Sequence, residues 1–340
     1  MELTTEYATP AELTGFARES VADREVNRPS LARWLPYRSI PDLQFRFTRG
    51  ASELTQAAAY RAYDAETRIG KRPGIQSVTG DLPPLGEKLR MTEYQQLRQR
   101  NMPDAITDQV YDDARRLVAK IIARLELARA DALVNGVVTI AEDDVEATID
   151  FGRDPSHEVT AATAWTNPAA PILDDLQAWT QAYVDANGTE PGAIVTSRRV
   201  ASLMMANEQL RGQVSGTSAA LVTLDQINAI LASLGLPPVE RYDAQFVDPS
   251  GVTRRAIPDD RFLMLPEAVD PMGESRLGAT LLGQTLESEE PDYALQPAEQ
   301  PGIVVGNFKT RDPIGLWTHA AAIGIPIMAN PDATFVADVA

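Results

Sequence analysis

Residues 104–135 constrain the fold of this 340-residue chain more than any other segment. Apolar side chains recur there at spacings of three and four residues, the period of a helix with one buried face. Neither Gly nor Pro interrupts the segment, Pro103 suits a helix start, and Asn135-Gly136 suits a helix end. We therefore predict a single helix about 45 Å long, at about 1.5 Å per residue. The predicted apolar stripe consists of Val110, Ala114, Leu117, Val118, Ile121, Ile122, Leu125, Ala128, Ala132 and Leu133.

This helix is predicted to be a spine and not part of a bundle or a coiled coil. No second helix of comparable length follows it, and the apolar pattern lasts only about three heptads. Its other faces carry charged side chains, which we expect to be exposed to solvent. These are Asp112, Asp113, Arg115, Arg116, Lys120, Arg124, Arg129 and Asp131.

The first 40 residues are predicted to form an arm. Apolar residues are sparse there, and Pro29, Pro36 and Pro41 interrupt any long helix. A short helix is expected over residues 10–20, because Thr9 suits its N-cap. An arm of this kind is expected to lack a core of its own, and either to stay disordered or to lie along a partner.

Residues 41–90 are predicted to form a long extended hairpin. Leu43, Phe45 and Phe47 alternate with polar residues, the period of a strand with one buried face, and residues 75–79 suit the returning strand. Residues 80–86 are expected to break regular structure. A protrusion of this length without a core is uncommon in a monomer. We interpret it either as an ordinary surface loop or as an arm that packs on a neighbouring subunit.

The chain after Gly136 is predicted to be a mixed region of strands and helices without internal repeats. Residues 266–301 are rich in Gly, Pro and Glu and are expected to be loops. Ile172, Leu173, Leu176, Trp179 and Tyr183 should line the buried side of the first helix of this region. Strands are expected at 137–140, 193–195, 245–247, 252–254, 262–265, 303–305, 316–318, 323–327 and 334–339, and helices at 167–186, 197–206 and 224–234.

The composition leaves few groups for catalysis. The chain has no Cys, which excludes disulfides and cysteine nucleophiles, and its two His are His157, expected to be exposed, and His319, expected to be structural. No GxGxxG, Walker A, GxSxG or HExxH pattern is present. Glu142-Asp143-Asp144 lacks the spacing of an EF-hand loop, so a solvated loop is favoured over cation binding there. We predict no catalytic residues, no metal and no cofactor.

Charge is distributed unevenly along a chain whose net charge is −17. Residues 28–100 carry 13 Lys and Arg against 7 Asp and Glu, a net charge of +6, whereas residues 136–340 carry 11 against 29, a net charge of −18. An acidic chain repels nucleic acid and anionic lipid, so neither specific DNA binding nor membrane binding is expected. The asymmetry favours docking onto copies of the same chain, although a soluble acidic protein with one uneven stretch fits equally well. Arg198-Arg199 and Arg254-Arg255 are interpreted as ion-pair partners or subunit contacts.

The order of these elements resembles the major capsid proteins of tailed bacteriophages, specifically the lambda-type major capsid protein E family. The resemblance rests on the long helix that ends in residues 126–136 and on the helix–strand–helix run over residues 172–206. It rests also on Lys309-Thr310-Arg311-Asp312-Pro313, which is followed by Ile325-Pro326-Ile327. It covers nearly the whole chain and implies an α+β protein with the Hong Kong 97-type capsid fold.

This resemblance implies four segments: an N-terminal arm at 1–40, an extended E-loop at 41–90, a peripheral domain at 91–165 and 306–340 with its spine helix at 104–135, and an axial domain at 166–305. It implies a structural protein, not an enzyme, that self-assembles as pentamers and hexamers into the icosahedral head of a tailed phage. The head would enclose the double-stranded DNA without specific binding. In the E-loop, the candidate subunit contacts are Arg61, Arg68, Lys71 and Arg72.

The implied partners, besides the chain itself, are a separate scaffolding protein, a portal and a decoration protein. The implied location is the virion, after assembly in the host cytoplasm. Some relatives in the fold cross-link Lys to Asn, but the four Lys of this chain match no such motif, so no cross-link is predicted. Two other functions remain open: an encapsulin-type compartment shell, which shares the fold but encloses enzymes, and a soluble monomeric α/β enzyme with a protruding hairpin.

Overall fold

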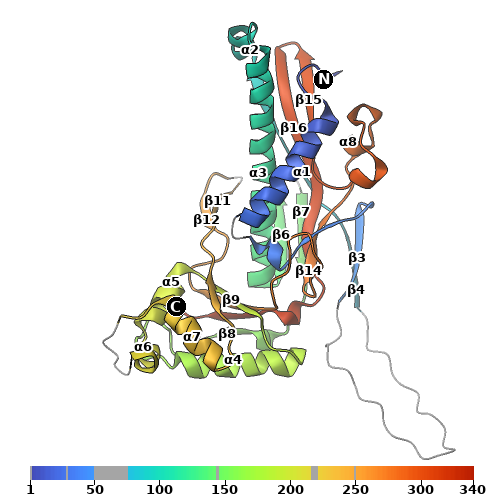
Figure 1. Ribbon diagram of the computed structural model, residues 1–340. Coiled ribbons are helices and arrows are strands. Elements are labelled where there is room, and N and C mark those ends of the chain that lie inside the picture. Colours follow the sequence, from blue (N-terminus) through green and yellow to red (C-terminus); the bar gives the residue numbers. More distant parts are fainter. Residues whose placement is uncertain (1, 28–29, 50–75, 143–144, 216–220, 249) are drawn as a thin grey trace, which may run out of the picture.

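The computed structural model describes residues 2–27, 30–49, 76–142, 145–215, 221–248 and 250–340. Two bodies make up this part of the chain (Figure 1). The spine body is a six-stranded sheet with helices α1, α2 and α3, and the base body is a five-stranded sheet with helices α4 to α7. The base body lies across the lower end of α3 in the view of Figure 1.

The predicted spine helix is confirmed as α3, Pro103–Asn135. All ten residues of the predicted apolar stripe are buried. Gly136 ends the helix in the left-handed conformation, with φ of 67°, and its N–H donates to the carbonyl of Ala132. A residue with a Cβ is strained at that angle, which is why Gly suits this position.

The sheet of the spine body is organised around one long strand, β16, Ile314–Met328. This strand pairs antiparallel with β15, β5 and β14, so segments from the middle and the end of the chain meet on it. Helices α1 and α3 pack on one face of this sheet and share a core with it. The other elements of the body are β1 (Glu2–Leu3), α1 (Pro10–Asn27), β2 (Tyr37–Ser39), β5 (Pro84–Thr92), α2 (Glu93–Gln99), β14 (Gly278–Leu282) and β15 (Val304–Arg311).

The base body has the strand order β10-β9-β13-β17-β8. Its core includes the stacked rings of Trp165 and Trp179, whose centroids are 5.6 Å apart. Ser197 caps α5, because its side chain accepts from the N–H of Val200. The elements are β8 (Glu158–Thr160), α4 (Ile172–Asn187), β9 (Ala193–Thr196), α5 (Arg198–Ala206), α6 (Glu208–Ser215), α7 (Leu224–Ser233), β10 (Val239–Arg241), β13 (Arg261–Leu265) and β17 (Phe335–Asp338).

Three two-stranded hairpins and one short helix complete the described fold. The hairpins are β3 with β4, β6 with β7, and β11 with β12, and helix α8 precedes β15. Their bounds are β3 (Gln44–Arg49), β4 (Gln76–Asp81), β6 (Val137–Glu142), β7 (Val145–Asp150), β11 (Gln245–Val247), β12 (Thr253–Arg255) and α8 (Leu286–Glu289). None of the helices in the described ranges is both long and apolar enough to span a bilayer.

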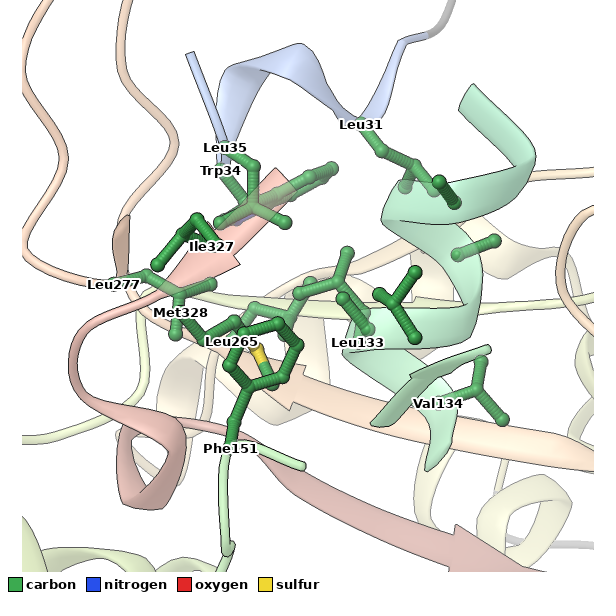
Figure 2. Close-up of a cluster of buried hydrophobic side chains, with 14 of the residues drawn as sticks. Leu31, Trp34, Leu35, Leu133, Val134, Phe151, Leu265, Leu277, Ile327 and Met328 are labelled. Atoms are coloured by element: carbon green, nitrogen blue, oxygen red, sulfur yellow. The ribbon is translucent and has the colours of Figure 1, made fainter. Parts of the chain in front are cut away.

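One apolar cluster joins the two bodies (Figure 2). Leu133 and Val134 at the end of α3 meet Leu265 of the base sheet, and Trp34 and Leu35 of the arm pack on the same cluster. The indole N–H of Trp34 donates to the carbonyl of Pro266 at 3.0 Å. The junction between the bodies is therefore a continuous core and not a flexible linker.

The expectation that the arm lacks a core was wrong. Helix α1 runs on to Asn27, seven residues beyond the predicted end, and Leu13, Ala17 and Val21 are buried against α3 and the spine sheet. These three residues recur at a spacing of four, so they line one face of the helix. That spacing provides a narrow apolar stripe even though apolar residues are sparse overall.

Several short elements differ from the predictions. Residues 80–86 do not break regular structure: β4 runs to Asp81, and β5 begins at Pro84 and pairs with β16 over nine positions. Proline is tolerated at the first position of an edge strand, where its missing N–H removes no ladder bond. The predicted loop at 266–301 contains β14 and α8, helix α6 was not predicted, and α4 begins at Ile172 and not near 167.

The predicted domain bounds do not follow the two sheets. Strands β8 and β17 fall in the predicted peripheral segments 91–165 and 306–340, yet both belong to the base sheet. Conversely, β14 falls in the predicted axial segment 166–305 and pairs with β16 in the spine sheet. The sheet to which each of these strands belongs is decided by pairing with strands far away in the sequence. The apolar periodicity of a segment carries no information about its pairing partner.

Three charged residues of α3 are buried, two of which were predicted to be exposed: Asp113, and Arg129, which is completely buried. The third, Glu126, accepts from Arg129 Nη1 at 2.9 Å. Arg129 lies four residues after Leu125, so the helical spacing places it on the same buried face as the apolar stripe. Only its charge favoured an exposed position. Its Nη1 also lies 3.4 Å from Glu25, and its Nε donates to Thr280 at 2.8 Å.

Ile121→Ala is expected to destabilise the isolated subunit by about 2–5 kcal/mol, because a buried side chain leaves a cavity. Ile121 is 4% exposed. Chemical denaturation measures the effect, with Asp108→Ala on the exposed face of the same helix as the control. A loss below about 0.5 kcal/mol, the range of ordinary surface changes, would contradict the burial of the stripe.

Arg129→Met is expected to cost about 3–5 kcal/mol of unfolding free energy, because it leaves Glu25 and Glu126 buried without a counter-ion. Arg115→Met removes an exposed i,i+3 partner of Asp112 on the same helix and should change stability by about 0–1 kcal/mol. The denaturant midpoints of the two variants measure and compare these losses of stability. Equal effects would mean that leaving Glu25 and Glu126 without their counter-ion costs no more than breaking a surface ion pair.

Candidate assembly surfaces

The candidate contact residues of the predicted E-loop, Arg61, Arg68, Lys71 and Arg72, lie outside the described residues. The structure describes the base from which residues 50–75 depart. Strands β3 and β4 pair antiparallel from Gln44 with Asp81 to Arg49 with Gln76, which confirms the predicted hairpin at this end. Arg49 and Gln76, the described residues on either side of this segment, are therefore neighbours.

The hairpin base is anchored by aromatic residues on one face. Phe45 is 2% exposed and belongs to the cluster that joins the two bodies, whereas Leu43 is 51% exposed, contrary to prediction. The ring of Phe47 lies 6.2 Å from that of Phe151. A Cβ on Gly80 would lie 2.6 Å from the ring of Phe45, so this glycine leaves the space that the ring occupies. The direction in which the hairpin starts is thus set by the subunit core.

Apolar side chains are exposed together at the far end of the spine body. They come from α2, from the residue before α3 and from the first residue of β16. Helix α2 has no buried residue. A hollow of about 350 Å³ beside these side chains is lined in part by Tyr7, Leu97 and Ile314. We call this set the tip surface and define it as Tyr94, Leu97, Met102 and Ile314, each 54–68% exposed.

Three arginines of α5 and the β11–β12 hairpin form ion pairs within the chain. Arg199 lies 3.4 Å from Asp259, and Arg255 lies 3.1 Å from Asp243. Arg254 lies 2.7 Å from Asp248 across the turn between β11 and β12. The interpretation of these arginines as ion-pair partners is confirmed for all three.

The two histidines do not lie together in the described structure. The expectation that His157 is exposed was wrong, because it is 1% exposed and its Nδ1 lies 3.1 Å from the carbonyl of Thr334. Desolvation lowers the pKa of His319, whose ring packs against Phe308. Residues 143 and 144 of the acidic run lie outside the described part, and Glu142 pairs with Arg124 at 3.1 Å. Among the described residues no three His, Asp or Glu gather as metal ligands.

A groove of about 600 Å³ lies between α1, α3 and the segment that leads into β11. Glu25 and Glu126 line it, and both carboxylates contact Arg129. Sequence reasoning missed this cluster. The available signal was a Glu three residues before an Arg, both on the buried side of a helix, which is the spacing of a pair on one face.

Comparison with known proteins identifies a family. A family model described as phage major capsid protein E matches residues 48–339. No curated protein matches the chain. Among solved structures, a phage-related protein from Bordetella bronchiseptica RB50 is similar over 96% of both chains, with a TM-score of 0.64 and 13% identity.

A second solved structure, assigned as a prophage capsid protein of Escherichia coli CFT073, has a TM-score of 0.58 and 14% identity. The match covers 78% of this chain and 80% of that chain. At 13–14% sequence identity, the similarity to these two structures shows the fold alone. It confirms the predicted α+β class and the Hong Kong 97-type capsid architecture.

We expect Leu97→Asp and Ile314→Asp to weaken association between subunits without unfolding them. Both side chains are more than half exposed, so the unfolding free energy should change by less than about 0.5 kcal/mol. Light scattering of purified subunits measures association. Met272→Asp, at an equally exposed apolar residue away from the tip surface, is the control. Wild-type association of the two tip variants would contradict a role for the tip surface.

Proposed function

This chain belongs to the phage major capsid protein E family, and on that premise we propose how its segments build a shell. It is a structural protein, not an enzyme, and it forms the capsid shell of a bacteriophage. The observation that carries this conclusion is the family match over residues 48–339. Self-association and a place in the virion capsid follow from that function. Membership of the phage major capsid protein E family also favours a phage shell over an encapsulin-type compartment.

We propose that the spine body is the peripheral domain and the base body the axial domain of the subunit. The pairing of strands supports this division better than the sequence bounds do, because it assigns β8 and β17 to the base body and β14 to the spine body. Subunits would form pentamers and hexamers that tile an icosahedral head around double-stranded DNA. Electron microscopy of the chain expressed with the neighbouring phage proteins tests this, and a monodisperse monomer at assembly concentrations would contradict it.

We propose that residues 50–75 act as an E-loop that lies on an adjacent subunit. Two observations support the proposal: the β3–β4 base fixes the direction of departure, and residues 28–100, which include the loop, have a net charge of +6 against −18 for residues 136–340. Opposite charges on the two sides of a contact steer encounter between subunits.

The acidic chain also supports enclosure of DNA without specific binding. A net charge of −17 repels phosphates, which keeps the genome from adhering to the shell during packaging. We propose further that a separate scaffolding protein, a portal and a decoration protein take part, and that assembly occurs in the host cytoplasm. Copurification from cells that express the neighbouring phage proteins tests these partners.

Reversal of Arg68 and Lys71 to Glu is expected to slow assembly at low salt and to flatten its dependence on ionic strength. Each exposed pair contributes about 0–1 kcal/mol, and charges more than about 8 Å apart are screened at physiological salt. Light scattering across a salt series measures the rate, while thermal melting checks that the subunit is intact.

The matched control is reversal of Arg198 and Arg241, which changes the net charge equally on exposed positions of the base body. If the loop variant assembles at the wild-type rate, or if the control slows equally, the electrostatic role of the loop is wrong. In the second case, total charge would account for the slower assembly.

A further inference from the structure

Glu126 collects donors from three separate parts of the chain. The backbone N–H of Leu31 donates to its Oε1 at 2.7 Å, and the Tyr242 hydroxyl donates to the same atom at 2.5 Å. Arg129 Nη1 donates to Oε2 at 2.9 Å. Leu31 belongs to the arm, Arg129 to the spine helix, and Tyr242 follows strand β10 of the base body. One carboxylate on α3 therefore holds both the arm and the base body.

The second carboxylate of the cluster fastens the arm to the same place. Glu25 at the end of α1 accepts from the hydroxyl of Tyr37 at 2.8 Å and lies 3.4 Å from Arg129. The guanidinium of Arg129 stacks on the ring of Tyr37, 4.3 Å from its centroid. Burial raises the pKa of Tyr242, and the neighbouring Glu126 raises it further, so the hydroxyl stays protonated and able to donate.

The rest of the junction between the bodies is an apolar cluster, with two further directional contacts from the arm: the Trp34–Pro266 bond and a half-exposed ion pair of Arg33 with Glu240 at 3.0 Å. Leu133, Leu265 and Val336 belong to the cluster that spans both bodies (Figure 2). Apolar burial supplies stability, but it is roughly proportional to area and has no direction. Hydrogen bonds lose strength steeply when their angle changes, so the bonds of Glu126 resist rotation of one body against the other.

We propose that Glu126 is a positioning residue that sets the angle between the spine body and the base body, and thereby the curvature of the shell. The link to curvature rests on the proposed function. In a ring of identical subunits, a change in the shape of the subunit repeats at every contact. A small change of the angle between the two bodies therefore alters how the ring closes. The Tyr242 hydroxyl is the part of the cluster contributed by the base body.

Tyr242→Phe tests the proposal with minimal disturbance, because it removes one hydroxyl and keeps the ring. Tyr183→Phe is the matched control. Tyr183 is also buried, and its hydroxyl donates at 3.2 Å to Ala333, in the turn that leads into β17 of the base body. Both variants lose one buried hydroxyl bond, but only Tyr242→Phe loses the bond to the spine helix.

The angle can be measured on unassembled subunits, because the chain has no native Cys to interfere with labelling. Asp108→Cys on α3 and Gln177→Cys on α4, both exposed, accept spin labels in the two bodies. Pulsed EPR should give one narrow distance distribution for the parent and for Tyr183→Phe. Tyr242→Phe should give a shifted or broader one. An unchanged distribution, or equal broadening in both variants, overturns the proposal.

Shell diameters by electron microscopy test the second half of the inference. Tyr242→Phe should give shells of mixed or altered diameter, whereas the parent and Tyr183→Phe should give uniform shells. Uniform wild-type shells from a variant with an altered angle would overturn the link to curvature. If the parent chain forms no shells even when it is expressed with the neighbouring phage proteins, the proposed assembly fails, and the EPR distances still decide whether Glu126 sets the angle.

Discussion

The apolar stripe of α3 is the constraint on which the rest of the structure depends. A single helix of 33 residues with one buried face needs cover along its whole length, and the described part of the chain has no second helix of comparable length to provide it. The cover comes from α1 near the N-terminus, from β5, and from β15 and β16 near the C-terminus. The two ends of the chain must therefore return to the spine, and contacts of this kind close long loops at an entropic cost. Most of the base body is therefore one excursion of the chain from β8 to β13, and its last strand, β17, is supplied after β16.

The elements with a strong periodic pattern could be predicted from the sequence, and the elements defined by pairing could not. The spine helix, α5, α7 and β13 have stripes or caps that local physics explains. Strands β5 and β14 have no such pattern, because their place is set by β16, which lies far away in the sequence. The same dependence on distant partners explains why the predicted domain bounds do not follow the two sheets. Sheet membership of β8 and β17 depends on pairing partners and not on their own residues.

The buried charges were missed for a different reason. Arg129 was assigned to the solvent face by residue type, although its spacing places it on the stripe, since a buried charge is costly unless it is paired. The partners are Glu126, three residues earlier on the same helix, and Glu25, more than a hundred residues earlier. Only the first could be found from local spacing. A buried ion cluster often contributes little net stability, so its place at the junction fits a role in specificity better than one in folding.

The charge of the subunit limits how a shell can be held together. A chain with a net charge of −17 repels its copies at long range, but that repulsion is screened beyond about 8 Å at physiological salt. Association must then come from short-range contacts, and the apolar side chains exposed on the described surface are few and scattered outside the tip surface. Contacts that are weak one by one dissociate quickly, so a subunit added at a wrong angle can leave before its neighbours lock it in place. A subunit of fixed shape with weak contacts therefore closes a regular shell more readily than a flexible subunit with strong ones.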